Sequence, residues 1–540
     1  MTNRRIFLKK VGLGTTGLGL MSLAAARPIA TQGERAPLLA KAGGGLPRST
    51  PESQGVSSEG ILEFVNAIGR SRHEFHSFMV VRHGKVVAEG WWSPYRAEFN
   101  HAMYSLSKSF TSTAVGLAIA EGKLTVEDRV VTFFPEELPE KVSENLAALR
   151  VKHLLTMSAG QDPEPTWEIV KHKNWVKAFL AWPFPHPPGS VFLYNSSATY
   201  MLSAIVQKVT GQKVVDYLAP RLFEPLDIPG VTWETCPRGI NTGGWGLNIR
   251  TEGLAKFGQL YLQKGAWKGL QLLPAKWVEQ ATTFKIQQPY PAHPSRPNSE
   301  NDWLQGYCYQ FWRCTHRAFR GDGAFGQYTI VMPEKDAVVA ITSETSDMQG
   351  ELDLVWKHLL TAMKDEPLPP NPEGQARLRQ ALASLVLPLP AGNPSSPLAG
   401  RLSGRRFRMD ENTLGIRGGQ FTFHKDACLF MLADARGEYP ITCGIGHWAP
   451  GQTALPGTPP RLVSGGAPKP GTPSRIASAA AWKEGDTLSI LIRYCETPHH
   501  DNVTCRFNGN ELEIQFINSM AAMSPHPNDP RPVLKGQLLT

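Results

Sequence analysis

The fold of this 540-residue chain is decided by the stretch Tyr104-Ser105-Leu106-Ser107-Lys108-Ser109-Phe110, which contains its only Ser-x-x-Lys pattern. A helical pattern begins at Ser105 and ends at the stop signal Gly122. The spacing of three puts the Ser105 hydroxyl and the Lys108 amine on one helical face. Serine is a weak nucleophile until a base removes its proton, and lysine serves as that base when desolvation lowers its pKa. The pattern therefore predicts Ser105 as a nucleophile and Lys108 as its activating base.

The alternative for this motif is structural, with Ser105 capping the helix and Lys108 on a solvated face. Bulky apolar neighbours argue against a solvated face: Tyr104, Leu106 and Phe110. Alone, the motif has low specificity, because a chain of this length contains about one or two by chance.

Two further stretches carry residues suited to the same site. The first, Phe192-Leu193-Tyr194-Asn195-Ser196-Ser197, precedes a predicted helix, where the Tyr194 phenol can share protons with the Ser-Lys pair. A core tyrosine is the alternative there. The second, Gly321-Asp322-Gly323-Ala324-Phe325-Gly326-Gln327, leads into a strand pattern. Its glycines let a substrate lie against a strand edge and a backbone N–H complete an oxyanion hole, whereas a plain glycine-rich turn is the alternative.

The order of the predicted elements indicates an α+β fold. A hairpin pattern covers residues 78–82 and 85–91, strand patterns return at 328–332 and 337–342, and a closing helix follows at 352–363. The intervening chain, to about residue 285, is mostly helical, and in it Ser196 or Ser197 is expected to cap a helix that ends at Gly211. One sheet is therefore built from both ends of the segment, with a helical subdomain inserted between them.

Together and in this order, the three motifs resemble the serine β-lactamase and penicillin-binding protein superfamily, in particular its class C β-lactamase-like branch of esterases and 6-aminohexanoate-dimer hydrolases. Three more stretches are similar to that family: residues 153–160, 246–251 and 267–274. The resemblance covers residues 46–365 and implies an antiparallel sheet flanked by helices.

The resemblance also implies roles for the site residues. Ser105 would be the nucleophile, Lys108 its base, and Tyr194 the tyrosine of a Tyr-x-Asn motif that relays protons. The backbone N–H groups of Ser105 and Ala324 would form the oxyanion hole. The implied mechanism is acylation of Ser105 followed by attack of water, with no metal and no organic cofactor.

Two departures from the family pattern bear on the substrate. The third position of Tyr-x-Asn is Ser196, with the asparagine shifted to Asn195, and we expect both beside the substrate. The Lys-Thr-Gly strand motif is replaced by Gly321-Asp322-Gly323, whose aspartate would repel the carboxylate that the family's cation holds. This favours a serine esterase or amidase acting on a small-molecule substrate without that carboxylate. The alternatives are a β-lactamase or DD-peptidase, and a non-catalytic envelope binding protein. A Ser-His-Asp site stays formally open, although the chain has no Gly-x-Ser-x-Gly elbow.

The N-terminus has the pattern of an export signal. A twin-arginine pair, Arg4-Arg5, stands in a basic segment before an apolar stretch from Val11 to Leu23, and small residues follow at 24–26. We expect residues 1–26 to be a cleaved twin-arginine signal peptide, with the mature protein periplasmic or secreted and not inserted in the membrane. An uncleaved membrane anchor is the alternative.

The remaining features concern the second domain and the partners. Residues 366–400 are Pro-rich and predict a linker, and residues 401–540 read as a β-rich accessory domain similar to a lipocalin-type barrel. The chain has seven cysteines, and their pairing cannot be deduced from the sequence. Cys495 and Cys505 either form a disulfide between two strands or remain buried free thiols.

Removal of residues 1–26 lowers the formal charge from +9 to +5, and no basic run is interleaved with aromatics, so nucleic acid is not an expected partner. The sequence leaves the oligomeric state open.

Overall fold

A computed structural model describes residues 44–289, 296–463, 473–524 and 528–539. Residues 45–540 form one compact unit. The predicted signal peptide, residues 1–26, lies outside the described residues. In the described part of the chain, no helix combines the length and apolar character that a bilayer span requires.

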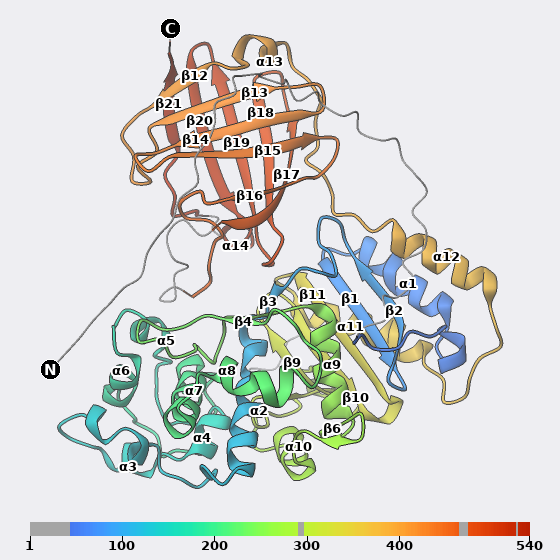
Figure 1. Ribbon diagram of the computed structural model, residues 1–540, viewed down its shortest axis with the longest axis vertical. Coiled ribbons are helices and arrows are strands. Elements are labelled where there is room, and N and C mark those ends of the chain that lie inside the picture. Colours follow the sequence, from blue (N-terminus) through green and yellow to red (C-terminus); the bar gives the residue numbers. More distant parts are fainter. Residues whose placement is uncertain (1–43, 290–295, 464–472, 525–527, 540) are drawn as a thin grey trace, which may run out of the picture. The chain divides into compact units, whose positions relative to one another are not determined.

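The first half of the unit is built on a six-stranded antiparallel sheet with the order β2-β1-β11-β10-β9-β8 (Figure 1). Its strands come from both ends of the segment, as the sequence predicted: β1 Glu74–Arg82, β2 Lys85–Trp91, β8 Trp312–Arg313, β9 Phe319–Gly323, β10 Gln327–Met332 and β11 Ala337–Glu344. Alternate residues of β1 enter two cores, because Phe78 and Val80 face one side while Met79 and Val81 face the other. The sheet is thus covered on both faces.

One core contains α1 (Ser58–Gly69) and the C-terminal helices of this segment. The predicted closing helix consists of an α-helical part, α11 (Met348–Leu354), and a π-helical part, η8 (Val355–Leu360). The predicted linker is not an extended chain, because it contains α12 (Pro372–Ala383), which packs against α1 and buries Leu378, and α13 (Pro397–Leu402). Both helices begin with proline, the residue whose fixed φ suits a first helical turn.

The other core contains the inserted helical subdomain. Its helices are α2 Ser107–Ala120, α3 Glu144–Ala148, α4 Val151–Leu155, α5 Thr166–Ile169, α6 Trp175–Ala181, α7 Ser196–Thr210, α8 Val214–Leu218, α9 Thr251–Leu262 and α10 Ala275–Thr282. Short strands join them: β3 His101–Ala102, β4 Thr232–Trp233, β5 Leu247–Ile249, β6 Ala266–Trp267 and β7 Leu270–Gln271. The helix α2 is buried on nearly all sides, so it forms the centre of this half. One expectation was wrong: Asn195, and neither Ser196 nor Ser197, caps α7, since its side chain accepts from the Ala198 N–H.

The C-terminal part is a closed antiparallel barrel, closed by a parallel pairing of β15 with β17 (Figure 1). Its elements are β12 Arg406–Met409, β13 Gly418–Phe423, β14 Ala427–Ala433, β15 Glu438–Ile445, β16 Ala449–Thr453, β17 Ser474–Trp482, β18 Thr487–Tyr494, β19 His500–Asn508, β20 Glu511–Asn518, α14 Ser519–Ala522 and β21 Leu534–Leu538. Large side chains, among them Phe421, Trp482 and Phe507, pack together in its core. The barrel therefore has a core of its own filled by side chains.

The cysteines settle one open alternative of the sequence. All seven are buried free thiols, so the possible Cys495–Cys505 bridge is not formed. The hairpin register explains why: Cys505 lies opposite Leu488 near the start of β18, whereas Cys495 follows the far end of that strand. The two residues are a strand length apart.

Candidate active site

A tight turn places Ser105 at the entrance of α2. Residues Tyr104–Leu106 form a 3-10 turn that runs directly into the helix. The Ser107 hydroxyl fixes the turn by donating to the Tyr104 carbonyl at 2.6 Å and accepting from the Leu247 N–H at 3.1 Å. Tyr104 has a φ of 46°, in the left-handed region that non-glycine residues seldom adopt. Ser105 is thereby presented at the positive end of a buried helix dipole.

Lys108 lies one turn further along and is almost fully buried, with 2% of its surface exposed. Its Nζ lies 3.0 Å from Ser105 Oγ, 3.0 Å from Ser196 Oγ and 2.7 Å from the Gly244 carbonyl oxygen. Burial lowers the pKa of Lys108 from 10.5 to about 7, although the carboxylates of Glu164 and Asp322 oppose the shift. A neutral amine has two N–H groups and one lone pair. It can therefore donate to Ser196 and Gly244 while accepting the Ser105 proton.

The residues of the Tyr194 stretch divide between two roles. The Tyr194 ring stacks on Trp312 at 5.7 Å, and Lys108 Nζ lies 4.9 Å from its centroid. Ser196 Oγ contacts Lys108, as described above. The Asn195 side chain instead caps α7 and donates to Gln161 Oε1 at 2.7 Å. Tyr194 and Ser196 thus lie beside the Ser-Lys pair, whereas the side-chain hydrogen bonds of Asn195 go to the start of α7 and to Gln161.

The Gly321-Asp322-Gly323 stretch forms the end of β9, next to the nucleophile turn. A Cβ at position 321 would lie 2.6 Å from Ser109 Oγ, and one at position 323 would collide with the Met103 carbonyl oxygen. Gly321 therefore allows the close approach of β9 to α2, and Gly323 allows its close approach to the residue before the nucleophile turn, a reason that the sequence interpretation did not include.

The charge of Asp322 is paired with a cation, Arg320. This corrects the expectation that the strand has no cation and that Asp322 acts as a bare negative charge. Arg320 lies two residues earlier on the same face of β9, and its Nε donates to Asp322 Oδ2 at 2.9 Å. Both side chains are buried. Burial raises the pKa of Asp322, and the Arg320 guanidinium opposes that shift. The aspartate is thus held as one half of a buried ion pair.

Ala324 begins the turn from β9 to β10. The next residue, Phe325, has a φ of 69°, and its ring lies 5.4 Å from that of Tyr104. Ser105 and Ala324 are the two residues whose backbone N–H groups we expect to form the oxyanion hole. Tyr104 precedes Ser105, Phe325 follows Ala324, and these two aromatic rings contact each other. With a base 3.0 Å from the hydroxyl, the arrangement can generate an alkoxide and form an acyl-serine.

Comparison with known proteins agrees with this geometry. The family model described as beta-lactamase matches residues 74–362, which include Ser105, Lys108, Tyr194 and the end of β9. The chain belongs to the beta-lactamase family.

Curated beta-lactamase-family relatives are distant in sequence. A 6-aminohexanoate-dimer hydrolase of Paenarthrobacter ureafaciens is 24% identical over 290 residues, which cover 50% of this chain and 73% of that protein. A beta-lactamase of Escherichia coli (strain K12) is 22% identical over 299 residues, 47% of this chain and 78% of that protein. Among solved structures, the octameric penicillin-binding protein homologue from Pyrococcus abyssi matches 88% of this chain and 99% of its own, at 16% identity and a TM-score of 0.46.

Sequence reasoning missed several groups of this beta-lactamase-family site. Glu164 accepts from the Ser196 N–H at 3.2 Å and acts on the Lys108 pKa, and the Gly244 carbonyl accepts from Lys108. No local signal marks either residue, because both come from loops distant in sequence. Arg320 could have been found, since two-residue alternation along a strand places it beside Asp322.

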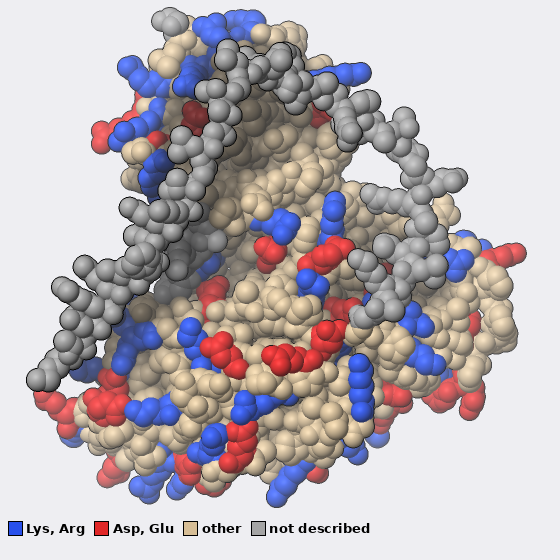
Figure 2. All heavy atoms as spheres, in the orientation of Figure 1, with Lys and Arg blue, Asp and Glu red and all other residues tan. Residues whose placement is uncertain are grey.

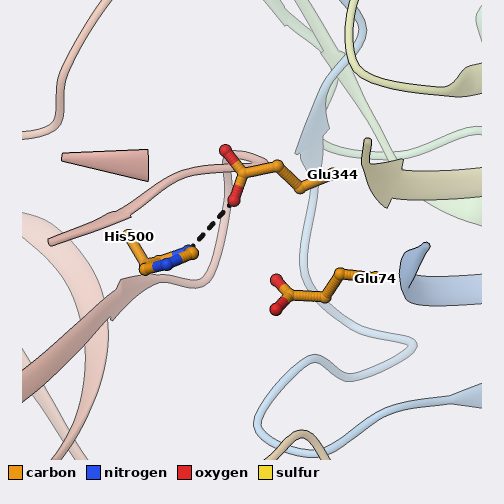
Figure 3. Close-up of side chains that lie close together, drawn as sticks. All are labelled: Glu74, Glu344 and His500. Atoms are coloured by element: carbon orange, nitrogen blue, oxygen red, sulfur yellow. Dashed lines mark hydrogen bonds and ion pairs between the residues drawn. The ribbon is translucent and has the colours of Figure 1, made fainter. Parts of the chain in front are cut away.

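A separate group of acidic and histidine side chains lies where β1, β11 and β19 begin or end (Figure 3). Within the described ranges, this is one group whose potential metal-ligand atoms lie within 4.8 Å of one another: Glu74, Glu344 and His500. Arg493 donates two hydrogen bonds to Glu74, at 2.5 and 2.8 Å, and His500 Nδ1 pairs with Glu344 at 3.0 Å. The carboxylates are thus already paired with cationic or donor groups, which does not favour a metal ion.

Proposed function

We propose that this protein is an exported serine hydrolase that cleaves an ester or amide bond through an acyl-enzyme on Ser105. The observation that carries the proposal is the buried Lys108 amine, 3.0 Å from Ser105 Oγ and with a pKa lowered to about 7. A base with a pKa near the working pH combines a useful neutral fraction with enough basicity to take the serine proton.

The proposed reaction has two halves. The Ser105 hydroxyl attacks the carbonyl carbon while its proton passes to Lys108, and the tetrahedral oxyanion is held by the N–H groups of Ser105 and Ala324. The leaving alcohol or amine then takes the proton that Lys108 received, with the Tyr194 phenol as the relay. Water then attacks the acyl-serine carbonyl while its proton passes to the same base. The bond to Ser105 Oγ breaks, the carboxylic acid product is released, and Ser105 takes the proton back from Lys108.

The substrate is proposed to be a small molecule that lacks the carboxylate of β-lactams and peptide C-termini. The end of β9 supports this, because the positive charge of Arg320 is already paired with Asp322. The relative named 6-aminohexanoate-dimer hydrolase supports an amide as the bond that is cleaved, but not the absence of a carboxylate, which such a dimer carries at one end. The relative named beta-lactamase makes β-lactam hydrolysis the second candidate.

The deciding experiment compares the mature protein with Ser105→Ala on a p-nitrophenyl ester and on a chromogenic cephalosporin. We expect ester turnover that falls by at least about 10³-fold in Ser105→Ala, with little cephalosporin cleavage by either protein. An exposed serine offers the matched control: Ser53→Ala should keep full activity. Full ester turnover by Ser105→Ala would refute the assignment. Efficient cephalosporin cleavage that depends on Ser105 would favour the second candidate.

Export and partners are proposals of the same kind. Arg4 and Arg5 support twin-arginine export to the periplasm or the medium, and conversion of both to lysine should retain the precursor inside the cell. Nucleic acid is not a proposed partner, and Figure 2 shows acidic and basic side chains interspersed over the face that it draws.

A further inference from the structure

A loop of the C-terminal barrel, residues 495–499, contacts the segment that leads to the nucleophile. The Ala102 N–H donates to the Glu496 carbonyl oxygen at 3.0 Å, and the Tyr95 hydroxyl donates to the Thr497 carbonyl oxygen at 3.0 Å. The loop ends at His499, whose side chain is fully buried and hydrogen-bonded to the Tyr104 hydroxyl. The barrel therefore reaches the residue that directly precedes Ser105.

Glu344 at the end of β11 orients the His499 ring. Its Oε1 lies 2.6 Å from His499 Nδ1, and hydrogen bonds from His499 and His500 lower the pKa of Glu344 to about 2 against the effect of burial. An ionised carboxylate only accepts hydrogen bonds, so Nδ1 carries the proton. The other ring nitrogen, Nε2, is hydrogen-bonded to the Tyr104 hydroxyl. Ser519 of the barrel adds a 2.5 Å hydrogen bond to the same Glu344 oxygen.

The His499 ring packs against both sides of the expected oxyanion hole. It lies 5.7 Å from the Tyr104 ring and 4.8 Å from the Phe325 ring, in edge-to-face arrangements. Tyr104 precedes Ser105, and Phe325 follows Ala324. The three rings thus connect the two backbone segments that carry the oxyanion-hole N–H groups.

Both of these segments hold an unfavourable backbone conformation. Tyr104 and Phe325 have φ values of 46° and 69°, in the left-handed region that is sterically unfavourable for a non-glycine residue. Such residues stay in place only when their side chains are held by their surroundings. Tyr104 and Phe325 adjoin Ser105 and Ala324 in the chain, so the contacts of His499 with both rings bear on where the two N–H groups lie.

We propose that His499 of the barrel is a positioning residue that aligns the Ser105 and Ala324 N–H groups on the tetrahedral oxyanion. The inference rests on the proposed function of Ser105. It gives the C-terminal barrel a part in catalysis: it supplies a buried contact on the nucleophile turn and does not touch the substrate. Glu74, drawn in Figure 3 with Glu344 and His500, accepts two hydrogen bonds from Arg493 of the barrel, and this pair anchors the barrel beside the contact.

The test uses the full mature chain and two readouts of oxyanion stabilisation. His499→Ala should lower kcat for a p-nitrophenyl ester by about 10²-fold, the size of the loss of one oxyanion-hole donor, with KM changed less than about threefold. The Ki of phenylboronic acid, which forms an anionic tetrahedral adduct on serine, should rise by a similar factor. His499→Gln retains a group that can accept from Tyr104 and should recover at least about tenfold of the loss. The exposed barrel residue His424 provides the control, and His424→Ala should leave all three constants unchanged.

The outcomes separate this inference from the assignment of Ser105. If Ser105→Ala is inactive but His499→Ala keeps the wild-type kcat and boronate Ki, the positioning role is refuted while the hydrolase assignment stands. If Ser105→Ala keeps full activity, the hydrolase assignment itself fails. Should His499→Ala not fold, as judged by circular dichroism, Tyr104→Phe removes only the hydroxyl that His499 binds. A loss of kcat and of boronate affinity in Tyr104→Phe then supports the inference, and wild-type values overturn it.

Discussion

The Lys108 pKa gives a prediction whose sign and size follow from the site. Only the neutral amine can take the Ser105 proton, so kcat/KM should rise with pH through a pKa of about 7 and level off above it. With the ordinary lysine value of 10.5, roughly one amine in 3,000 would be neutral at pH 7, against about one half for the lowered pKa. Burial of Lys108 therefore increases the concentration of active base about 10³-fold.

Glu164 is a carboxylate through which the Lys108 pKa can be moved. It accepts from the Ser196 N–H, and the Ser196 hydroxyl contacts Lys108, so carboxylate and ammonium lie roughly 6–9 Å apart, given ordinary hydrogen-bond lengths. At an effective dielectric constant of about 20, such a pair interacts by about 2–3 kcal/mol, or about 1–2 pKa units. The carboxylate stabilises the ammonium and raises the Lys108 pKa. Glu164→Gln should thus move the acid limb of kcat/KM to lower pH by about 1–2 units.

The assay is initial-rate hydrolysis of a neutral p-nitrophenyl ester from pH 4.5 to 9, read at the isosbestic wavelength of the product, with Glu168→Gln as the control. Glu168 is four residues away and exposed, so its variant should leave the profile unchanged. An acid limb that moves to higher pH in Glu164→Gln, or a wild-type profile without an inflection in this range, would refute the reasoning.

Three further substitutions test other parts of the site. Tyr194→Phe should lower kcat/KM by about 10²-fold if the phenol relays protons, and an unchanged rate would leave the tyrosine as a stacking partner only. Gly323→Ala should lower both the melting temperature and kcat, because its Cβ would collide with the Met103 carbonyl oxygen, and a wild-type melting curve would contradict the packing argument. Arg320→Met leaves Asp322 buried without its cation and should cost about 3–5 kcal/mol in the free energy of unfolding, measured with urea, whereas a loss below about 1 kcal/mol would show that the aspartate finds other partners.

Much of the fold could be predicted because local patterns agree with the final packing. Residues 78–81 form an apolar run, and alternate members of it enter two different cores, as expected of a strand covered on both faces. The spacing of Ser105 and Lys108 is set by one helical turn, so their contact also followed from sequence. In contrast, the cap of α7 was predicted one or two residues late, because asparagine and serine are similarly good caps and only the structure shows which side chain accepts.

The parts that could not be predicted depend on contacts between distant segments. Whether Cys495 and Cys505 lie close enough to form a disulfide depends on the register of the strands, which their spacing in the sequence does not give. The contact between His499 and Tyr104 joins residues 395 positions apart, and no local pattern relates them. The same holds for Glu164, whose effect on Lys108 arises only after a loop brings it beside Ser196.

The buried pair on β9 connects these observations to the substrate. From the sequence, Asp322 was a repulsive charge, but Arg320 cancels most of its field, so repulsion of a carboxylate is weaker than the motif alone suggested. Arg320 does not replace the family's cation either. Its side chain has no exposed surface, and its Nη1 donates to the Asp302 carbonyl oxygen at 2.9 Å. A substrate carboxylate would therefore meet neither an accessible positive charge nor a bare negative one at this strand. We therefore expect binding there to depend on shape and backbone hydrogen bonds, which supports the proposal of neutral esters and amides over substrates that are held by their carboxylate.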